Sequence, residues 1–391
     1  MIGRRLRQLR LARGLSLEAL VAAIGGVVTK QSLSKYEQGK ATPSPVVLNR
    51  LAGALGVKAA YLWSEPTIRV EFVAYRKGSA LPKGEQARVE GLVSEGLEAR
   101  VHLQQLLGQT DEISLPMQMF TVQKLEDTEA AATELRDQWQ LGLDPIANVT
   151  DVLERHFVHV LEIDVGERFD GISAVAYDDS GQKRSAAVVT RRGVSGERQR
   201  LSLAHELGHL VLKISETVDQ ETAAFRFGAA FLAPATLVRQ EVGRKRAFIQ
   251  SQELMLLKRQ YGMSIQALLR RLRDLEIITE TYYRQWCVDI SRLQWRRREP
   301  LEIPPEQPQW MRRAVLHALA ERLVSQEDAE AMIGESVQGE LALPTIERRS
   351  FMKLPLEERR RILAEQADKL TTYYAHDSEW RDMEAGDLVE Y

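Results

Sequence analysis

The first 63 residues carry apolar side chains at helical spacing, and glycines divide them into short segments. Ile2, Leu6 and Leu9 recur every three to four residues, which places them on one face of a helix that ends at Gly14. Ser16 and Thr29 stand where they can cap the two helices that follow. The pattern predicts five helices, which begin at Ile2 and then cover 17–24, 30–38, 46–55 and a last turn around 61–63.

The remainder of the chain mixes helices with a few short strands. Alternating residues at 68–73 predict a short strand or an extended linker, and the run 85–107 predicts a connecting helix with a solvated charged face. Further strands are expected at 157–163, 173–176 and 186–190, and further helices at 128–139, 145–155 and 253–295. The predicted fold class is therefore α+β, mostly helical, with a small central sheet.

Length and proline content divide the chain into domains. A chain of 391 residues is too long for one ordinary core, so two or three domains are expected. A proline-rich stretch, 300–308, marks one boundary. The predicted parts are a domain at 1–66, a linker and connecting helix at 67–125, a second domain at 126–299 and a helical C-terminal region of unassigned role at 300–391.

The composition, 44% hydrophobic and 28% charged, is that of a globular protein. Because no apolar run approaches the roughly 20 residues that cross a bilayer, and no signal peptide is recognisable, we expect no membrane partner. The single cysteine, Cys287, fits a reducing compartment, so we expect a cytoplasmic protein.

The net charge of −2 conceals an asymmetry. Residues 1–65 carry ten Lys and Arg against three acidic residues, a balance of +7 that leaves −9 on the remainder. A compact basic module on an acidic body indicates a polyanionic partner. Two short helices joined by a tight turn within such a module are typical of a helix-turn-helix, whose second helix enters the major groove of DNA.

The segment 2–63 resembles the lambda-repressor-like (XRE) helix-turn-helix family. The resemblance rests on the stretches 5–10, 14–16 and 32–39. It implies double-stranded operator DNA as a partner and, by analogy, a homodimer. On that reading base edges are contacted by Gln31 and Ser32, and phosphates by Lys30, Lys35, Lys40 and Arg10. Glu37 is expected to cap a helix or to form a pair within the bundle. The alternative to DNA binding is a helix-turn-helix module that is used for protein contacts only.

A second motif carries metal chemistry. His205-Glu206-Leu207-Gly208-His209 is an H-E-x-x-H sequence with apolar flanks. On a helix the two histidines lie one turn apart on one face, so both can reach one metal ion, and Glu206 can take a proton from a metal-held water. Glu221, at the start of a second apolar helix, can complete a His2Glu site with an open fourth position. The alternative is an amphipathic helix whose histidines are only packed or solvated.

The stretch 196–210, followed by Glu221 and a small-residue helix that ends at Pro234, resembles the ImmA/IrrE family of zinc metallopeptidases. The stretches 169–174 and 261–268 are similar too. The resemblance implies that His205, His209 and Glu221 bind one zinc ion per chain, with manganese as an alternative, and that Glu206 is the catalytic base. The chain departs from the family at Phe225, where the family usually has asparagine.

These features predict a DNA-binding transcriptional regulator that carries a zinc-dependent endopeptidase. The ImmA/IrrE resemblance implies cleavage of a helix-turn-helix repressor, or of the chain itself, under stress, mobile-element or defence control. A second hypothesis is a repressor or antitoxin-like regulator whose zinc domain is a sensor without proteolysis. A third is a purely structural zinc site, although a His2Glu set with an open position is typical of catalytic zinc.

Overall fold

The computed structural model describes residues 2–73, 81–109, 115–296, 298–337 and 348–376. It divides into a compact unit, Met1–Ser325, and a second unit, Gln326–Tyr391. The domain boundaries predicted after residues 66, 125 and 299 all fall inside the first unit and stay predictions. Within the described residues, no helix combines the length and the apolar character needed to cross a membrane.

The N-terminal module is the predicted bundle of five helices. They are α1 (Ile2–Ala12), α2 (Leu17–Ala23), α3 (Lys30–Glu37), α4 (Pro45–Leu55) and α5 (Ala59–Trp63). The hydroxyls of Ser16 and Thr29 accept backbone N–H groups at the starts of α2 and α3, as the sequence predicts. Gly14 has a positive φ of 66°, which favours glycine and ends the preceding helix. The helical spacing in the sequence therefore predicted this module correctly.

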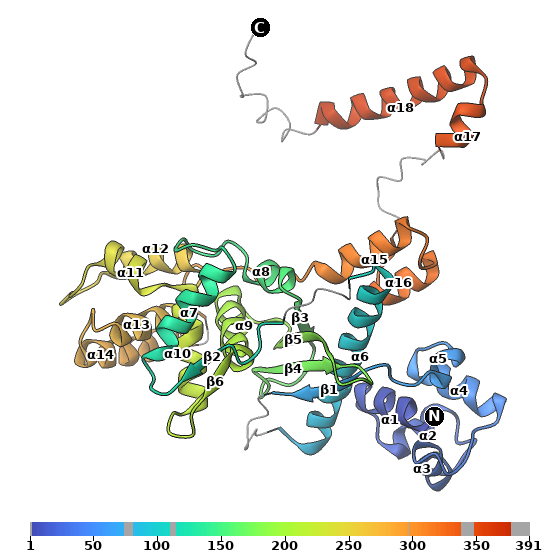
Figure 1. The fold of residues 1–391 in the computed structure, drawn as a ribbon, viewed down its shortest axis with the longest axis horizontal. Helices are drawn as coiled ribbons and strands as arrows, with labels where there is room; N and C mark the ends of the chain where they lie inside the picture. The colour runs from blue at the N-terminus through green and yellow to red at the C-terminus, as the bar shows by residue number, and fades with distance from the viewer. Residues whose placement is uncertain (1, 74–80, 110–114, 297, 338–347, 377–391) are drawn as a thin grey trace. The chain divides into compact units, whose positions relative to one another are not determined.

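A four-stranded mixed sheet lies at the centre of the first unit (Figure 1). Its strands are β1 (Arg69–Phe72), β3 (Val158–Ile163), β4 (Gly171–Tyr177) and β5 (Lys183–Arg191), in the order β1-β4-β5-β3. β3 runs parallel to β5, whereas β4 is antiparallel to both β5 and β1. All the predicted strands are present, and the segment at 68–73 is a strand of this sheet.

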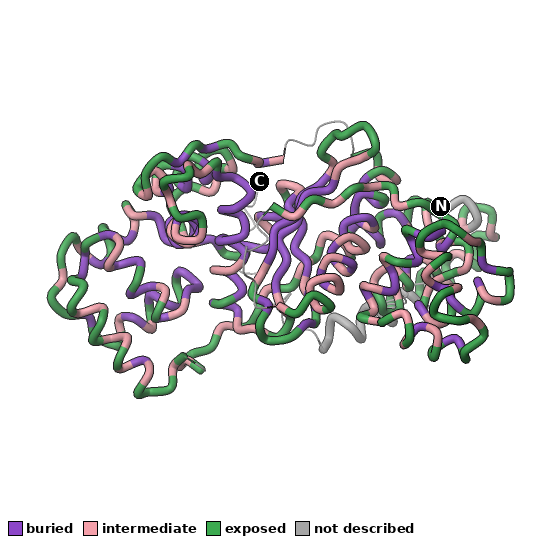
Figure 2. The backbone as a smooth tube through the Cα atoms, turned by 90° about the horizontal axis from the view of Figure 1, so that it is seen from below, coloured by how far each residue is buried: buried purple, intermediate pink, exposed green. Residues whose placement is uncertain are grey.

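Each face of the sheet packs against a different helix because successive side chains alternate between the faces. Val175 and its neighbours pack with α9 (Gly196–Val211) and α10 (Gln220–Leu232), whereas Ala174 and Ala176 pack with α6 (Lys83–Leu106). Figure 2 shows the sheet as the largest continuous buried region of the backbone. His205 and His209 therefore lie on a helix that packs against one face of the sheet.

The remaining elements of the first unit surround this core. They are β2 (Phe120–Val122), α7 (Asp127–Gln138), α8 (Val149–Arg155), β6 (Leu212–Ile214), α11 (Ala235–Val242), α12 (Ser251–Tyr261), α13 (Ile265–Asp274), α14 (Glu280–Arg292) and α15 (Trp310–Ala320). β2 and β6 form a separate parallel pair. The second unit contains α16 (Gln326–Ile333), α17 (Arg348–Lys353) and α18 (Leu356–His376), and the parts of the predicted C-terminal region at 338–347 and 377–391 lie outside the described residues.

The proline-rich stretch is bonded to the first turn of α9. The Gly196 N–H donates to the Ile303 carbonyl at 2.8 Å, and the Ile303 N–H donates to the Glu197 carboxylate at 3.1 Å. A Cβ at Gly196 would lie 2.2 Å from the Pro304 carbonyl oxygen, so the contact requires glycine. This strap stabilises the start of the helix that carries the H-E-x-x-H motif.

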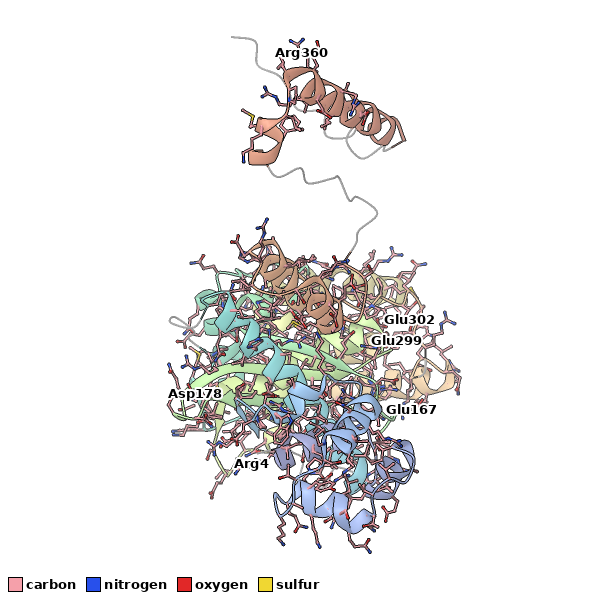
Figure 3. The ribbon with its side chains drawn as sticks, turned by 90° about the vertical axis from the view of Figure 1, so that its right-hand side faces the viewer. Arg4, Glu167, Asp178, Glu299, Glu302 and Arg360 are labelled. Atoms are coloured by element: carbon pink, nitrogen blue, oxygen red, sulfur yellow. The ribbon has the colours of Figure 1, made fainter. Side chains whose placement is uncertain are left out.

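The connecting helix does not have a fully solvated charged face, so that prediction was wrong. Most charged side chains of the first unit lie on its surface, as Figure 3 shows for Arg4. In contrast, Glu98 of α6 is only 5% exposed and forms an ion pair with Arg5 of α1, which is 1% exposed. The backbone N–H of Thr67 donates to the same carboxylate at 3.0 Å. One buried carboxylate thus joins the N-terminal module, the segment before β1 and α6.

The buried pair predicts a large loss of stability when one partner is removed. Glu98→Ala would leave the Arg5 guanidinium buried without its counter-ion, and we expect the free energy of unfolding to fall by about 3–5 kcal/mol. Chemical denaturation followed by circular dichroism measures this loss.

Glu95→Ala is the matched control. Glu95 lies on the same helix and pairs with Arg13, but the two side chains are 29% and 31% exposed. Partly solvated pairs contribute little, so we expect a loss of about 1 kcal/mol or less. Equal losses from the two variants would contradict the assignment of the larger effect to burial.

Candidate metal centre

The two histidines of the H-E-x-x-H motif lie on one face of α9. They are separated by one helical turn, and their Nε2 atoms are 3.1 Å apart. Both are buried, with exposed fractions of 4% for His205 and 8% for His209. The two imidazoles therefore converge on one point, as the spacing in the sequence predicts.

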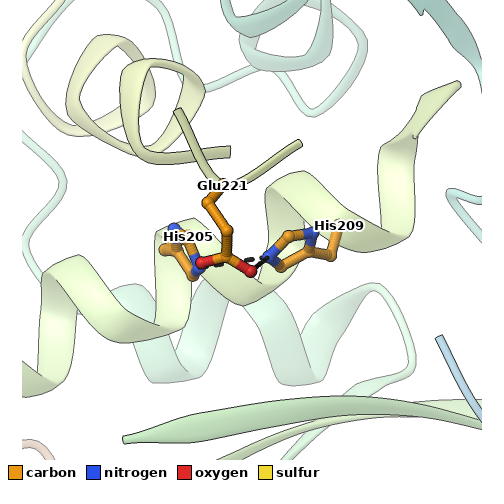
Figure 4. Close-up of side chains that lie close together, drawn as sticks. All are labelled: His205, His209 and Glu221. Carbon is orange, nitrogen blue, oxygen red and sulfur yellow. Dashed lines mark hydrogen bonds and ion pairs between the residues drawn. The ribbon is translucent and has the colours of Figure 1, made fainter. Parts of the chain in front are cut away.

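Glu221 joins them from the first turn of α10. Asp219 caps this helix, because its carboxylate accepts the Thr222 N–H at 2.8 Å, and this places Glu221 two residues after the cap. The Glu221 carboxylate oxygens lie 3.5 Å from Nε2 of His205 and 3.6 Å from Nε2 of His209 (Figure 4). Its side chain remains 36% exposed, so the cluster is open on this side.

The spacing of the three side chains fits a tetrahedral metal ion. Two atoms bonded to one zinc ion at about 2.0–2.2 Å lie roughly 3.3–3.6 Å from each other at the tetrahedral angle. The two histidine-to-carboxylate separations, 3.5 and 3.6 Å, match this range, and the 3.1 Å between the two histidine nitrogens is slightly shorter. Among the described residues, this is the one group of three or more histidine, cysteine or acidic side chains that could hold a metal ion. The cluster offers three candidate ligand atoms, one from each side chain.

Glu206 is held beside the cluster by a strand of the sheet. The Ser173 hydroxyl lies 2.7 Å from Oε2 of Glu206 and 2.8 Å from its backbone carbonyl. A Cβ at Gly171 would lie 2.8 Å from Oε1, so the carboxylate fits against β4 only because residue 171 is glycine. Glu206 is 6% exposed. Its carboxylate is thus fixed against β4, on the helix that carries the two histidines, and it is not one of the three converging side chains.

Sequence reasoning assigned no role to Ser173. The available signal was a serine at a position of β4 that faces α9, within an otherwise apolar run. A buried hydroxyl on such a strand needs a hydrogen-bond partner. In this structure Glu206 provides it.

Phe225 packs directly on the candidate ligand His205. Their ring centroids are 4.0 Å apart and the rings are tilted by 44°. The guanidinium of Arg270, a residue of α13, lies 5.8 Å from the centroid of the Phe225 ring. The residue at which the chain departs from the ImmA/IrrE pattern is therefore part of the wall of the cluster.

Two other histidines lie away from the cluster. His159 is completely buried and packs edge-on against Trp310, and burial places its pKa well below the usual range. His156 stacks on Trp139, and its partial burial lowers its pKa. Both rings therefore pack against tryptophan side chains and not against the candidate ligands.

Five of the six residues expected at DNA lie on or beside the accessible surface of α3. Lys30, Gln31 and Lys35 are exposed on this helix, Ser32 is half-buried, and Lys40 is exposed just after it. Ser32 also accepts or donates a 3.0 Å hydrogen bond with Thr29, and Lys30 pairs with Glu18 of α2. These side chains extend from the first to the last turn of α3, and Lys40 follows its C-terminal end.

Arg10 is placed elsewhere. It is 8% exposed, its guanidinium donates to both carboxylate oxygens of Glu37 at 2.6 and 2.8 Å, and it also donates to the Leu15 carbonyl. A guanidinium engaged in this way holds α1 against α3 and has no face left for a phosphate. The expected internal pairing of Glu37 is therefore present, and we no longer expect Arg10 to contact a phosphate.

Comparison with known families agrees with both halves of this description. Residues 2–61 match the model of a family described as a helix-turn-helix domain. Residues 154–273 match the model of the peptidase M78 family, described as an IrrE N-terminal-like domain. The comparison with curated proteins found no match. The chain thus joins an N-terminal XRE-like helix-turn-helix domain to an IrrE-like metallopeptidase domain, and both resemblances noted in the sequence are confirmed.

The geometry predicts that Glu221 contributes to metal affinity. Glu221→Ala removes one of three converging ligands, and we expect zinc to bind roughly tenfold more weakly or worse. Competition with a chromophoric chelator measures the affinity. Glu216→Ala, an exposed glutamate in the preceding loop, is the control and should bind zinc as the parent does. Unchanged affinity in Glu221→Ala would exclude Glu221 as a ligand.

Proposed function

We propose that this chain is a cytoplasmic DNA-binding regulator whose second domain is a zinc-dependent endopeptidase. The observation that carries the proposal is that one acidic side chain lies outside the group of converging side chains and is held in place separately. Three side chains converge on one point, while a fourth, Glu206, is held beside them by Ser173. A purely structural zinc site uses four protein ligands and has no use for an oriented carboxylate outside them.

A zinc ion in this site would supply a Lewis acid and lower the pKa of a water molecule to about 7. His205, His209 and Glu221 would hold the ion. The Glu206 carboxylate would accept the proton of the attacking water and pass it to the leaving amine, since it is fixed at the edge of the cluster. The Ser173 hydroxyl would keep this carboxylate in place during both transfers.

The proposed substrate is a helix-turn-helix repressor or the chain itself, under stress, mobile-element or defence control. What supports a protein substrate is the metallopeptidase match together with the partial exposure of Glu221. The DNA-binding module in the same chain would bring the peptidase to the operators at which such repressors act. Identification of the cleaved protein by mass spectrometry would name the target.

The second candidate is a regulator whose zinc domain senses a signal without proteolysis. The contact between Phe225 and His205 favours it, because an aromatic ring occupies the position at which the family usually has a polar amide. The two functions differ in their need for Glu206. Proteolysis requires its carboxylate, whereas metal-dependent sensing requires only the three ligands.

Glu206→Gln distinguishes them. The amide cannot take a proton, so we expect cleavage to fall by at least about 10³-fold while zinc and DNA binding are kept. Purified protein is incubated with itself and with helix-turn-helix repressors encoded nearby, and fragments are read by mass spectrometry. A specific cut that persists in Glu206→Gln would remove this residue from the mechanism. No cut by the zinc-loaded parent would favour the sensor.

For DNA, we propose that α3 enters the major groove of an operator and that the chain binds as a homodimer. Gln31 and Ser32 would contact base edges, and Lys30, Lys35 and Lys40 would contact phosphates. The exposure of these side chains on one helix and its flank supports the assignment. Arg10 would stabilise the module from inside by pairing with Glu37.

Lys35→Ala is expected to weaken DNA binding for all sequences alike. Loss of one phosphate contact should lower the slope of log affinity against log salt concentration by about 1. Fluorescence anisotropy with a labelled duplex at several salt concentrations measures this slope. Arg259→Ala, an exposed basic residue of α12, is the control and should leave the slope unchanged. The same slope for Lys35→Ala and the parent would contradict a phosphate contact at Lys35.

A further inference from the structure

β1 lies on the edge of the sheet that borders the candidate catalytic carboxylate. It pairs antiparallel with β4, with Phe72 opposite Ala174, and the Val73 N–H donates to the Ser173 carbonyl at 2.9 Å. Ser173 is also the residue whose hydroxyl holds Glu206. The C-terminal end of β1 therefore reaches the residue of β4 that holds Glu206.

The direction of β1 leads along β4 toward the cluster. Gly171, the first residue of β4, lies two positions beyond Ser173 in the direction in which β1 runs, and a Cβ at this position would lie 2.8 Å from the other oxygen of Glu206. A peptide in the place of β1 would therefore pass Glu206 in extended form. It would lie at the edge of the sheet beside Ser173, whose side chain contacts Glu206 of α9, the helix that carries His205 and His209.

β4 would be an edge strand without β1. An edge strand offers a row of unpaired N–H and C=O groups, to which an extended peptide can add by main-chain hydrogen bonds. The opposite edge of the sheet is β3, which is separated from β4 by β5. Of the two edges, the one that contacts Glu206 is the one that β1 covers.

β1 is held by a small set of contacts. It has four residues, and only Val70 and Phe72 face the core, each partly buried against the α6 side of the sheet. Arg69 and Glu71 face outward, with side chains 68% and 49% exposed. β1 itself thus contributes two half-buried side chains, and its other anchors, Ile68 and the hydrogen bond from Thr67 to Glu98, lie just before the strand.

We propose that β1 is a built-in competitor for the substrate, which binds along β4 as an extended segment in the place of β1. The inference rests on the proposed peptidase function and specifies its substrate. The substrate segment would be extended or able to unfold locally. It would carry apolar residues at alternate positions, to replace Val70 and Phe72, and small or polar residues between them.

Peptide binding tests the edge directly. The probe is a fluorescein-labelled synthetic copy of residues 67–73, and the protein is the full chain in the Glu206→Gln form so that the probe is not cut. With V70S/F72S added, β1 should leave β4, and we expect the probe to bind at least about tenfold more tightly than to Glu206→Gln alone. E71S is the matched control, since this side chain lies on the outer side of the same strand. Equal binding to all three proteins overturns the proposal.

A reversible disulfide between β1 and β4 provides a second test that does not depend on the folding of the double variant V70S/F72S. Because Val73 and Ser173 form a hydrogen-bonded pair, Val70 and Ala176 form a non-hydrogen-bonded pair, whose Cα atoms lie about 4.5 Å apart and suit a disulfide. V70C/A176C is made with C287S, so that no other thiol is present. We expect the oxidised form to cleave its substrate at least about fivefold more slowly than the reduced form of the same protein.

The two experiments separate the proposals. Cleavage at equal rates by the oxidised and reduced forms would overturn competition by β1 and leave the peptidase standing. No cleavage by any form, together with tighter probe binding to V70S/F72S, would remove the peptidase and keep β4 as a peptide-binding edge. Tighter probe binding and a redox-dependent cleavage rate together support both.

Discussion

The close contact between α9 and α10 is the constraint on which the candidate site depends. A Cβ at Gly228 would lie 2.9 Å from the backbone nitrogen of His205, and a Cβ at Gly208 would lie 3.2 Å from the Cα of Ala224. Glycine within a helix costs about 1 kcal/mol relative to alanine, so both positions are unfavourable locally. Packing offsets that cost. The short interhelical distance in turn brings Glu221, at the start of α10, within reach of the two histidines on α9.

The sheet supplies the other half of the site. The alternation of side chains along β4 directs Ser173 toward α9, where it holds Glu206, and directs Ala174 and Ala176 toward α6. The same strand thus orients the proposed base on one face and carries the connecting helix on the other. Through Glu98, that helix is bonded both to Arg5 of the DNA-binding module and to Thr67 just before β1. The module that would bind DNA and the strand that covers the site share one buried carboxylate.

Much of this organisation could be predicted because it is local. The helical spacing of Ile2, Leu6 and Leu9, the capping serine and threonine, and the glycine terminators predicted the five-helix module with ends within one or two residues. The four-residue spacing of the histidines predicted that both lie on one helical face, because that follows from the geometry of the helix alone. The two family resemblances added the identity of the domains. They did not specify how the domains contact each other.

The errors and omissions concern residues whose surroundings are set by distant parts of the chain. Arg10 has the charge and the helix position of a phosphate contact, but Glu37, 27 residues away, pairs with it inside the bundle. In the sequence Glu98 is not distinguishable from the other charged residues of α6, but in the structure α1 covers it and Arg5 pairs with it. The sequence by itself determined the local elements and the kinds of side chain available for metal and DNA. Only the tertiary structure decided which of them meet, because helix contacts, strand order and register depend on packing between residues far apart in the chain.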